Sequence, residues 1–299
     1  MKRLTLEFKK PLYYNLRSTC QSHGWVNLAP FKYDGKRNIL NFALNVTNQS
    51  YDIFVEEVDS KIITTIISED DYNEKEKNKI KNAVIRILDL RTDTSQLLRK
   101  AEKFGEEYVT LIKNGAGRLL RSSTLWEDAA KTLFTTNCSW ALTKKMCEAA
   151  CSKEFVRKTP YGIYPFPDSR AFLEFSSNEI RSLIPLGYRA DYFLSLSKIF
   201  SKYTVINEIE NGEFTFEEAY KQINSLKGFG EYATSHLLIL TGYFNKIPID
   251  TVVTSYLKRN YSFRKTQSFI DRHYGKWGDY KWWGLKLEKM LKKQNWLGN

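Results

Sequence analysis

The hydrophobic period of this chain changes near residue 94, and this change limits the possible folds more than any other feature of the sequence. Before it, apolar residues alternate with polar ones or form short runs bounded by turn residues, as in β-strands. After it, apolar residues recur at helical spacing. We therefore predict an α+β fold, with an N-terminal antiparallel β-sheet domain over residues 1–95 and an all-α domain over residues 96–299.

Five segments near the N-terminus carry strand patterns, and Asp34-Gly35 and Asp59-Ser60 are turn residues between neighbouring segments. The segments are Leu4–Phe8, Trp25–Tyr33, Ile39–Val46, Ile53–Val58 and Ile62–Ile67. A charged stretch then opens a helix whose Ile80, Val84 and Ile87 lie at helical spacing. This spacing predicts that one face of the helix packs on the sheet.

The region after residue 94 carries signals for helix starts. Thr124, Ser176 and Thr215 are each followed three residues later by Glu, which is the pattern of a capping box. No strand pattern recurs in this region. The second part of the chain is therefore expected to consist of helices and their connections.

The balance of charges favours a polyanionic partner such as nucleic acid. Lys and Arg number 46 against 34 Asp and Glu, which gives a formal net charge of +12. An anionic membrane surface would also attract such a chain, but no apolar run approaches the ~20 residues of a spanning helix. Met1 is not followed by a signal-peptide pattern. We therefore expect a cytoplasmic protein with no membrane partner.

The cysteines point to neither a disulfide framework nor a metal centre. Cys20, Cys138, Cys147 and Cys151 are few and scattered for a chain of 299 residues, so free thiols are expected. Cys147 and Cys151 lie four residues apart, a spacing that metal ligands can have, but all three histidines are remote in sequence. Structural metal sites usually need four clustered ligands, so we expect no metal and no cofactor.

A five-residue connection separates two predicted helices at about Phe216–Ser225 and Glu231–Tyr243. It consists of Leu226, Lys227, Gly228, Phe229 and Gly230. Glycine can adopt positive φ and lacks a Cβ, so backbone N–H groups at the start of the second helix can approach a phosphate. A plain helix corner stabilised by glycine explains the same five residues equally well.

An acid follows this second helix in a distinctive context. Ile247-Pro248-Ile249-Asp250 is an apolar turn that ends in an acid at the start of another helix, where most acids serve only as N-caps. The order of hairpin, amphipathic helix, loop and Pro-x-Asp resembles the helix-hairpin-helix (HhH-GPD) superfamily of DNA glycosylases. Similarity to its bacterial 3-methyladenine and 8-oxoguanine branches extends to Leu186–Tyr192, Thr135–Asn137 and Tyr274–Trp283. The strand-rich N-terminal region, Ser22–Phe31 and Gly117–Leu120 also resemble these branches.

This resemblance implies that Asp250 is the catalytic carboxylate, which stabilises an oxocarbenium-like sugar and orients the attacking water. It implies that DNA is bound by Leu226, Lys227, Gly228, Phe229, Gly230, Asn137, Tyr188 and Arg189, and that the base pocket is lined by Tyr232, His236, Trp277 and Trp282. Asn137 would fill the gap left by the flipped nucleotide, and Tyr188 would wedge into the neighbouring stack. Structural alternatives remain open for these residues: Asn137 as a helix cap, and the aromatic rings as core packing.

Three departures from the 8-oxoguanine branch narrow the expected chemistry. Tyr232 stands where strand-cutting members have a nucleophilic lysine, Leu142 where that branch has an arginine that reads the opposite cytosine, and Val252 where it has a histidine. We therefore expect a monofunctional glycosylase for a damaged base in double-stranded DNA. An aromatic pocket suits a cationic alkylated purine.

Two alternatives remain: an 8-oxoguanine-type enzyme without lyase activity, and a non-catalytic lesion-sensing module. By the same resemblance we expect a monomer that acts at the nucleoid of a bacterial-type cell.

Overall fold

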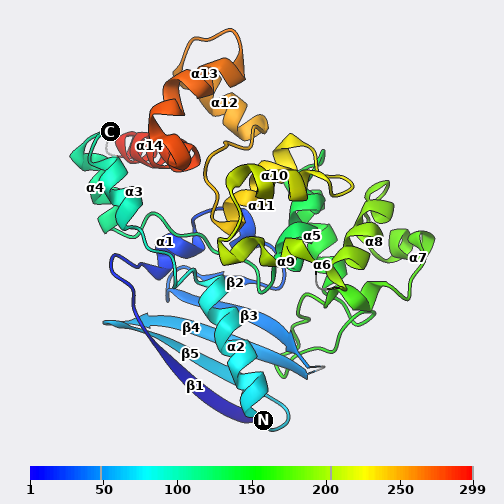
Figure 1. Cartoon of the computed structure of the whole chain (residues 1–299). Helices are drawn as coiled ribbons and strands as arrows, with labels where there is room; N and C mark the ends of the chain where they lie inside the picture. The colour runs from blue at the N-terminus through cyan, green and yellow to red at the C-terminus, as the bar shows by residue number, and fades with distance from the viewer. Residues whose placement is uncertain (48, 203, 298–299) are drawn as a thin grey trace. The chain divides into compact units, whose positions relative to one another are not determined.

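The computed structural model describes residues 1–47, 49–202 and 204–297 (Figure 1). The chain forms two compact units, each built from two segments. Unit 1 consists of Met1–Thr92 and Asn114–Thr204, and unit 2 of Asp93–Lys113 and Val205–Asn299. These units group the residues differently from the predicted division into 1–95 and 96–299, because 114–204 belongs to the same compact unit as the sheet. The predicted division into domains stays a prediction.

Unit 1 contains a five-stranded antiparallel sheet in the order β1-β5-β4-β3-β2. Its strands are β1 (Lys2–Lys9), β2 (Lys32–Asp34), β3 (Ile39–Val46), β4 (Gln49–Val58) and β5 (Lys61–Ser68). β3, β4 and β5 are sequential hairpin neighbours, and the β3–β4 register closes at Val46 opposite Gln49. The α+β fold class and the antiparallel sheet are therefore confirmed.

The predicted strand Trp25–Tyr33 is wrong over most of its length. Its first part is a 3-10 helix, η1 (Gly24–Asn27), and only the end enters β2. Trp25, Leu28 and Phe31 are all buried and lie three residues apart. A spacing of three places side chains on one face of a 3-10 turn, so this apolar run turns toward the core instead of extending along the sheet.

Helix α2 (Glu74–Ile87) packs on the sheet, as its spacing predicted. Asn73 caps its start within a complete capping box, and Ile80, Val84 and Ile87 are buried. Figure 1 shows this helix lying along the sheet. Burial of one apolar stripe against the sheet provides the main stabilisation that a charged helix of this kind can gain.

The other helices of unit 1 surround a cluster of buried aromatic rings. They are α1 (Leu16–Cys20), α5 (Leu125–Thr135), α6 (Trp140–Ala150), η2 (Ser169–Phe172), α7 (Ser177–Leu183) and α8 (Arg189–Phe200). The Trp126 ring contacts the rings of Phe172 and Phe193. Ser176 forms the predicted capping box, whereas Thr124 accepts a hydrogen bond from the backbone of Glu127 as a simple cap. These contacts fix the helix ends that carry the candidate DNA-binding residues of this unit.

Unit 2 is helical throughout its described residues. Its elements are α3 (Ser95–Ala101), α4 (Glu106–Lys113), α9 (Val205–Glu208), η3 (Ile209–Asn211), α10 (Phe216–Asn224), α11 (Glu231–Thr241), α12 (Thr251–Asn260), α13 (Thr266–Tyr274), η4 (Gly275–Tyr280) and α14 (Lys281–Leu297). The predicted capping box at Thr215 starts α10. Over the described ranges, no helix is both long and apolar enough to cross a membrane.

Candidate DNA-binding and catalytic site

The predicted hairpin lies between α10 and α11. Leu226 and Phe229 are buried, and the backbone N–H of Phe229 donates to the carbonyl of Leu226 across 3.1 Å. Lys227 is exposed between them, and Gly228 has a φ of 87°, a conformation that favours glycine. The two apolar side chains therefore anchor the turn, and the backbone and Lys227 are left at its surface.

Gly230 is the N-cap of α11 and contributes no side chain there. A Cβ at this position would meet nothing within 4 Å, so the space in front of the helix start is open. Glu231 and Tyr232 are the first residues of the helix, and backbone N–H groups in a first helical turn lack intrahelical partners. This arrangement can bind a phosphate through the backbone.

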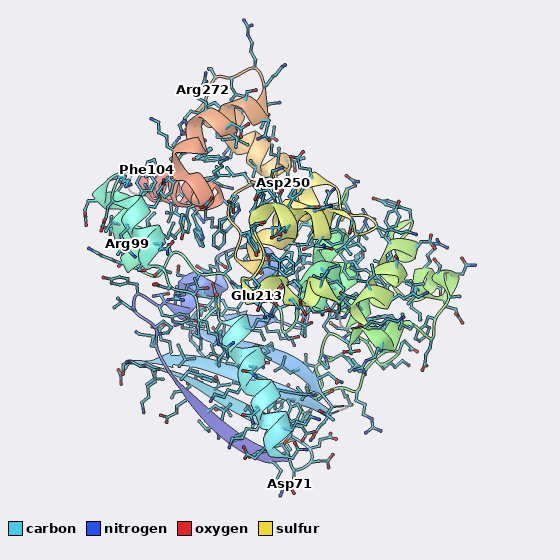
Figure 2. The ribbon with its side chains drawn as sticks, in the orientation of Figure 1. Asp71, Arg99, Phe104, Glu213, Asp250 and Arg272 are labelled. Carbon is cyan, nitrogen blue, oxygen red and sulfur yellow. The ribbon has the colours of Figure 1, made fainter. Side chains whose placement is uncertain are left out.

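Asp250 caps α12, and Figure 2 labels it at the start of this helix. Its Oδ1 accepts a hydrogen bond of 2.6 Å from the backbone N–H of Val253. Across the described part of the chain, no hydrogen bond reaches its other oxygen, Oδ2. The side chain is half-buried. Asp250 is thus both the helix cap that its position suggests and a carboxylate with one oxygen available to a substrate or water.

A lysine of α14 lies within electrostatic range of Asp250. Burial lowers the pKa of Lys289, and the charge of Asp250 acts in the opposite direction. The Lys289 ammonium also lies 5.4 Å from the centre of the Tyr256 ring, six residues along α12 from the cap. Burial, together with Lys289 and Lys293, lowers the pKa of Lys286 to about 8. One positive group of α14, Lys289, therefore accompanies the carboxylate.

A buried carboxylate, Glu288, connects α12, α13 and α14. It accepts hydrogen bonds from the hydroxyls of Tyr256 at 2.5 Å and Tyr274 at 3.1 Å, and it lies 3.1 Å from His273 Nε2. Burial raises the pKa of Glu288, but the hydrogen bonds from Tyr256 and its neighbours outweigh burial and hold the pKa below its ordinary value. This cluster holds α12 in place, and α12 is the helix that Asp250 caps.

Tyr232 and His236 lie on one face of α11, as their spacing predicted. The Tyr232 hydroxyl lies 3.3 Å from His236 Nδ1, and the ring centres are 5.7 Å apart in an edge-to-face arrangement. Both side chains are partly exposed. The pair combines two aromatic surfaces with a hydrogen-bonding edge, which is a suitable lining for a nucleobase pocket.

The two C-terminal tryptophans differ in their surroundings. Trp277 is 3% exposed and stacks on Phe104, with ring centres 4.1 Å apart. A Cβ on Gly284 would lie 2.5 Å from the Trp277 ring, so the ring is packed tightly. Trp282 is half-buried and contacts Phe244. Trp277 therefore packs in the core of unit 2, the structural alternative considered for it, while Trp282 retains some exposed surface.

In unit 1, Asn137 occupies the turn between α5 and α6. Its φ of 46° is left-handed, a conformation that asparagine tolerates better than most residues. The exposed Asn137 side chain approaches the Tyr188 hydroxyl through Nδ2 at 3.4 Å, and Tyr188 is 54% exposed. Ser139, not Asn137, is the N-cap of α6. Tyr188 is therefore not a buried ring, and the two side chains are presented together.

Arg189 lies beside this turn but is only 4% exposed. Its guanidinium donates to the backbone carbonyls of Thr136, Asn137 and Leu186. It also lies 4.6 Å from the centre of the Tyr188 ring. Its hydrogen-bonding groups are thus engaged by the turn, so this geometry favours a positioning residue over the direct DNA contact that the sequence suggested.

Comparisons by sequence find no match to this chain, whereas comparisons by structure do. No protein-family model matches the chain, and no curated protein matches its sequence. Known structures match over nearly the whole chain. The 3-methyladenine DNA glycosylase from Archaeoglobus fulgidus has 17% identity and a TM-score of 0.70, covering 94% of this chain and 96% of that one.

The apo form of the 8-oxoguanine glycosylase/lyase from Clostridium acetobutylicum has 14% identity and a TM-score of 0.72, covering 95% of this chain and 94% of that one. The same enzyme in complex with double-stranded DNA containing cytosine opposite 8-oxoguanine has 16% identity and a TM-score of 0.64, covering 97% and 98% of the two chains. This chain has the fold of the DNA glycosylases.

Sequence reasoning missed two residues of α14: Lys289, which lies within electrostatic range of Asp250, and Glu288, which holds the helix that Asp250 caps. Lys289 and Glu288 lie on α14, where only the aromatic residues attracted notice. A signal existed, because Lys286, Lys289 and Lys293 recur at helical spacing and form a basic stripe. Only the i,i+4 pair with Lys292 is a local signal for Glu288, since its hydrogen-bond partners come from two other helices.

Proposed function

We propose that this protein is a monofunctional DNA glycosylase that removes an alkylated purine from double-stranded DNA and leaves an abasic site. The observation that carries the proposal is Asp250, which uses Oδ1 to cap α12 and keeps Oδ2 clear of protein donors in the described structure. A purely structural cap needs only the first oxygen. The glycosylase fold supplies the context in which the second one has a use.

The proposed reaction uses Asp250 in its ionised form. A helix N-terminus favours negative charge, so α12 supports ionisation of the carboxylate. The carboxylate stabilises positive charge that develops on the sugar as the glycosidic bond breaks, and it orients the water that attacks C1′. The hairpin holds the DNA backbone through Lys227 and the N–H groups behind Gly230.

The absence of strand cleavage is proposed from the residue at position 232. An amine is needed to form a Schiff base with the sugar, and Tyr232 provides none. Lys227 is exposed within the hairpin, where it faces phosphate in the proposed complex. Water is therefore the nucleophile in the proposed reaction.

The preference for an alkylated purine is proposed from the aromatic character of the candidate pocket. Tyr232 and His236 form an edge-to-face pair, and the half-buried Trp282 keeps some exposed aromatic surface. Aromatic faces attract a cationic base, and alkylation at a ring nitrogen both charges the base and weakens its bond to the sugar. The proposed enzyme acts as a monomer on DNA of the cytoplasm.

The test is mass spectrometry of free bases released from alkylated, oxidised and undamaged duplex DNA. Methylated purines are expected among the products of the wild-type protein. Asp250→Asn should reduce release by about 100-fold or more while duplex binding persists. Binding without release from any DNA would instead support a lesion-sensing module, and release of 8-oxoguanine only opposite cytosine would support the 8-oxoguanine-type alternative.

A borohydride trap tests the second part of the proposal. Borohydride reduces a Schiff base between a lysine and the sugar to a stable covalent adduct. No adduct is expected with this protein under conditions where base release proceeds. A trapped protein–DNA species would contradict the monofunctional assignment while leaving base excision intact.

A further inference from the structure

The segment around Gly24 in unit 1 is held by hydrogen bonds from both of its neighbouring residues. His23 Nε2 lies 2.6 Å from the carbonyl of Leu120. The Trp25 indole donates a 2.7 Å hydrogen bond to Asp128, and both side chains are buried. The backbone at Gly24 is therefore fixed on both sides by contacts to residues about a hundred positions away.

The ring of Trp140, from α6, packs directly against Gly24. A Cβ at this position would lie 2.6 Å from Cη2 and 2.9 Å from Cζ2 of Trp140, so only glycine leaves room for the ring. Despite this contact, Trp140 is 41% exposed. The indole thus rests on a fixed backbone while part of its surface stays open to solvent and available for stacking.

Trp140 lies next to the turn that presents Asn137. It is the first residue of α6, whose N-cap Ser139 accepts a 3.3 Å hydrogen bond from the backbone N–H of Leu142. Asn137 precedes it by three residues and approaches Tyr188. The turn thus carries an exposed amide and an exposed indole, and the exposed Tyr188 at the start of α8 approaches the amide.

The exposed side of α6 is basic. Lys144 lies four residues after Trp140 and so shares its helix face, and Lys145 follows it. Both lysines are exposed, and neither has a carboxylate within ion-pair distance among the described residues. An aromatic ring beside unpaired ammonium groups matches the two parts of a nucleotide, the base and the phosphate.

We propose that Trp140 stacks on the base of the undamaged strand that loses its partner when the damaged nucleotide leaves the helix, with Lys144 at that strand's phosphate. This inference rests on the proposed function. In the proposed complex Asn137 fills the gap in the lesion strand, and we place Trp140, three residues further on, at the base left without a partner. Every base has an aromatic face, so stacking holds the orphaned base without reading its identity. Leu142, in the same turn of helix, offers no hydrogen-bonding group.

The test uses a duplex with a tetrahydrofuran abasic-site analogue and 2-aminopurine opposite it. This probe does not depend on knowing the excised base. Wild-type protein should quench the 2-aminopurine fluorescence by stacking. Trp140→Ala should abolish the quenching and weaken binding by about tenfold, whereas Trp140→Phe should keep most of both. Tyr161→Ala is the matched control, since Tyr161 is 58% exposed in the same unit and contacts Phe54 of the sheet.

Gly24→Ala gives a second, independent variant. It retains the indole but must displace the ring tip, so binding and quenching should fall between those of wild type and Trp140→Ala. Unchanged quenching and binding in Trp140→Ala, or changes no larger than in Tyr161→Ala, would overturn the inference. Quenching seen only with 2-aminopurine in the lesion strand would also overturn it. If the wild-type protein binds the abasic-analogue duplex no more tightly than the intact duplex, the proposed function itself is contradicted.

Discussion

Asp128 of unit 1 and Asp250 of unit 2 are two aspartates at the starts of helices with opposite surroundings. Asp128 is fully buried and accepts hydrogen bonds from the Trp25 indole, the Ser122 backbone and the Arg86 guanidinium. Asp250 is half-buried and accepts one, from its own helix. Both oxygens of Asp128 accept hydrogen bonds from the protein, whereas only one oxygen of Asp250 does so among the described residues. The same side chain is thus fully engaged by the protein in one unit and keeps one oxygen clear of protein donors in the described part of the other.

The same contrast separates two lysines. Lys131 of unit 1 is fully buried against Glu127 at 2.6 Å; burial lowers its pKa, but the Glu127 charge outweighs burial and raises it. Lys286 of unit 2 has no carboxylate partner among the described side chains, and burial lowers its pKa to about 8. Lys131 thus has a counterion within ion-pair distance, whereas Lys286 has none among the described side chains.

The largest effect is expected from Asp128→Asn. Removing one partner of a buried charged cluster costs about 3–5 kcal/mol, because the Arg86 guanidinium loses the Asp128 charge that lies 2.8 Å away. The free energy of unfolding, measured with urea at pH 7, should fall by this amount. Burial raises the pKa of Asp128, but Arg86, Ser122 and Trp25 outweigh burial and lower it.

A lowered pKa gives this prediction a pH signature. The carboxylate of Asp128 stabilises the fold above its unfolded pKa of about 4, and that contribution is lost as the pH falls through the lower folded value. The stability difference between wild type and Asp128→Asn should therefore shrink below about pH 4. A stability difference that does not change with pH would mean that the substitution acts through altered packing or hydrogen bonding and not through loss of charge.

A second prediction concerns the turn that presents Asn137. Arg189→Lys replaces a guanidinium that serves three backbone carbonyls with a single ammonium, and unsatisfied buried carbonyls cost about 2 kcal/mol. Binding to an abasic-analogue duplex should weaken as well, since the turn loosens. The control is Arg181→Lys, whose pair with Asp191 is exposed and should contribute about 1 kcal/mol or less. Equal losses of stability and of duplex binding in the two variants would show that Arg189 has no positioning role.

The contrast between the aspartates also marks what the sequence could predict. The sheet, the hairpin and the cap at Asp250 follow from patterns within about ten neighbouring residues, and the structure contains all three. The buried position of Asp128 depends on Trp25, which is 103 residues away. No local period carries that pairing, and the same distance explains why the segment around Trp25 was predicted as a strand.

Arg189 and Trp277 show the second limit. Each residue has the type expected at a DNA-binding or base-binding site, yet Arg189 is engaged by backbone carbonyls and Trp277 is stacked on Phe104. Residue type indicates which interactions a side chain can make. Only the packing of elements distant in sequence decides whether those interactions are made within the protein.

A third prediction uses the uncompensated lysine. Lys286→Met removes a half-buried charge and should stabilise the protein by about 1 kcal/mol at pH 7. The pKa of Lys286 is lowered to about 8 in the folded protein, so the unfolded chain binds more protons between pH 8 and its ordinary value near 10.5. Wild-type stability therefore rises across that range, and the advantage of the variant should decline. Lys293→Met, at an exposed position of the same helix, is the control. An advantage that persists unchanged at pH 10 would reflect packing alone.

The smallest effect is expected from Asp250→Asn on stability. Asparagine and aspartate are similarly good N-caps, so the unfolding free energy should change by only about 0.5 kcal/mol or less, whereas Asp250→Ala should cost about 1 kcal/mol through loss of the cap to Val253. Urea titrations of both variants beside Asp128→Asn measure this order directly. A loss in Asp250→Asn as large as that in Asp128→Asn would make Asp250 a second structural anchor. A small one, combined with lost base release, would separate the charge of Asp250 from its capping role and assign the charge to catalysis.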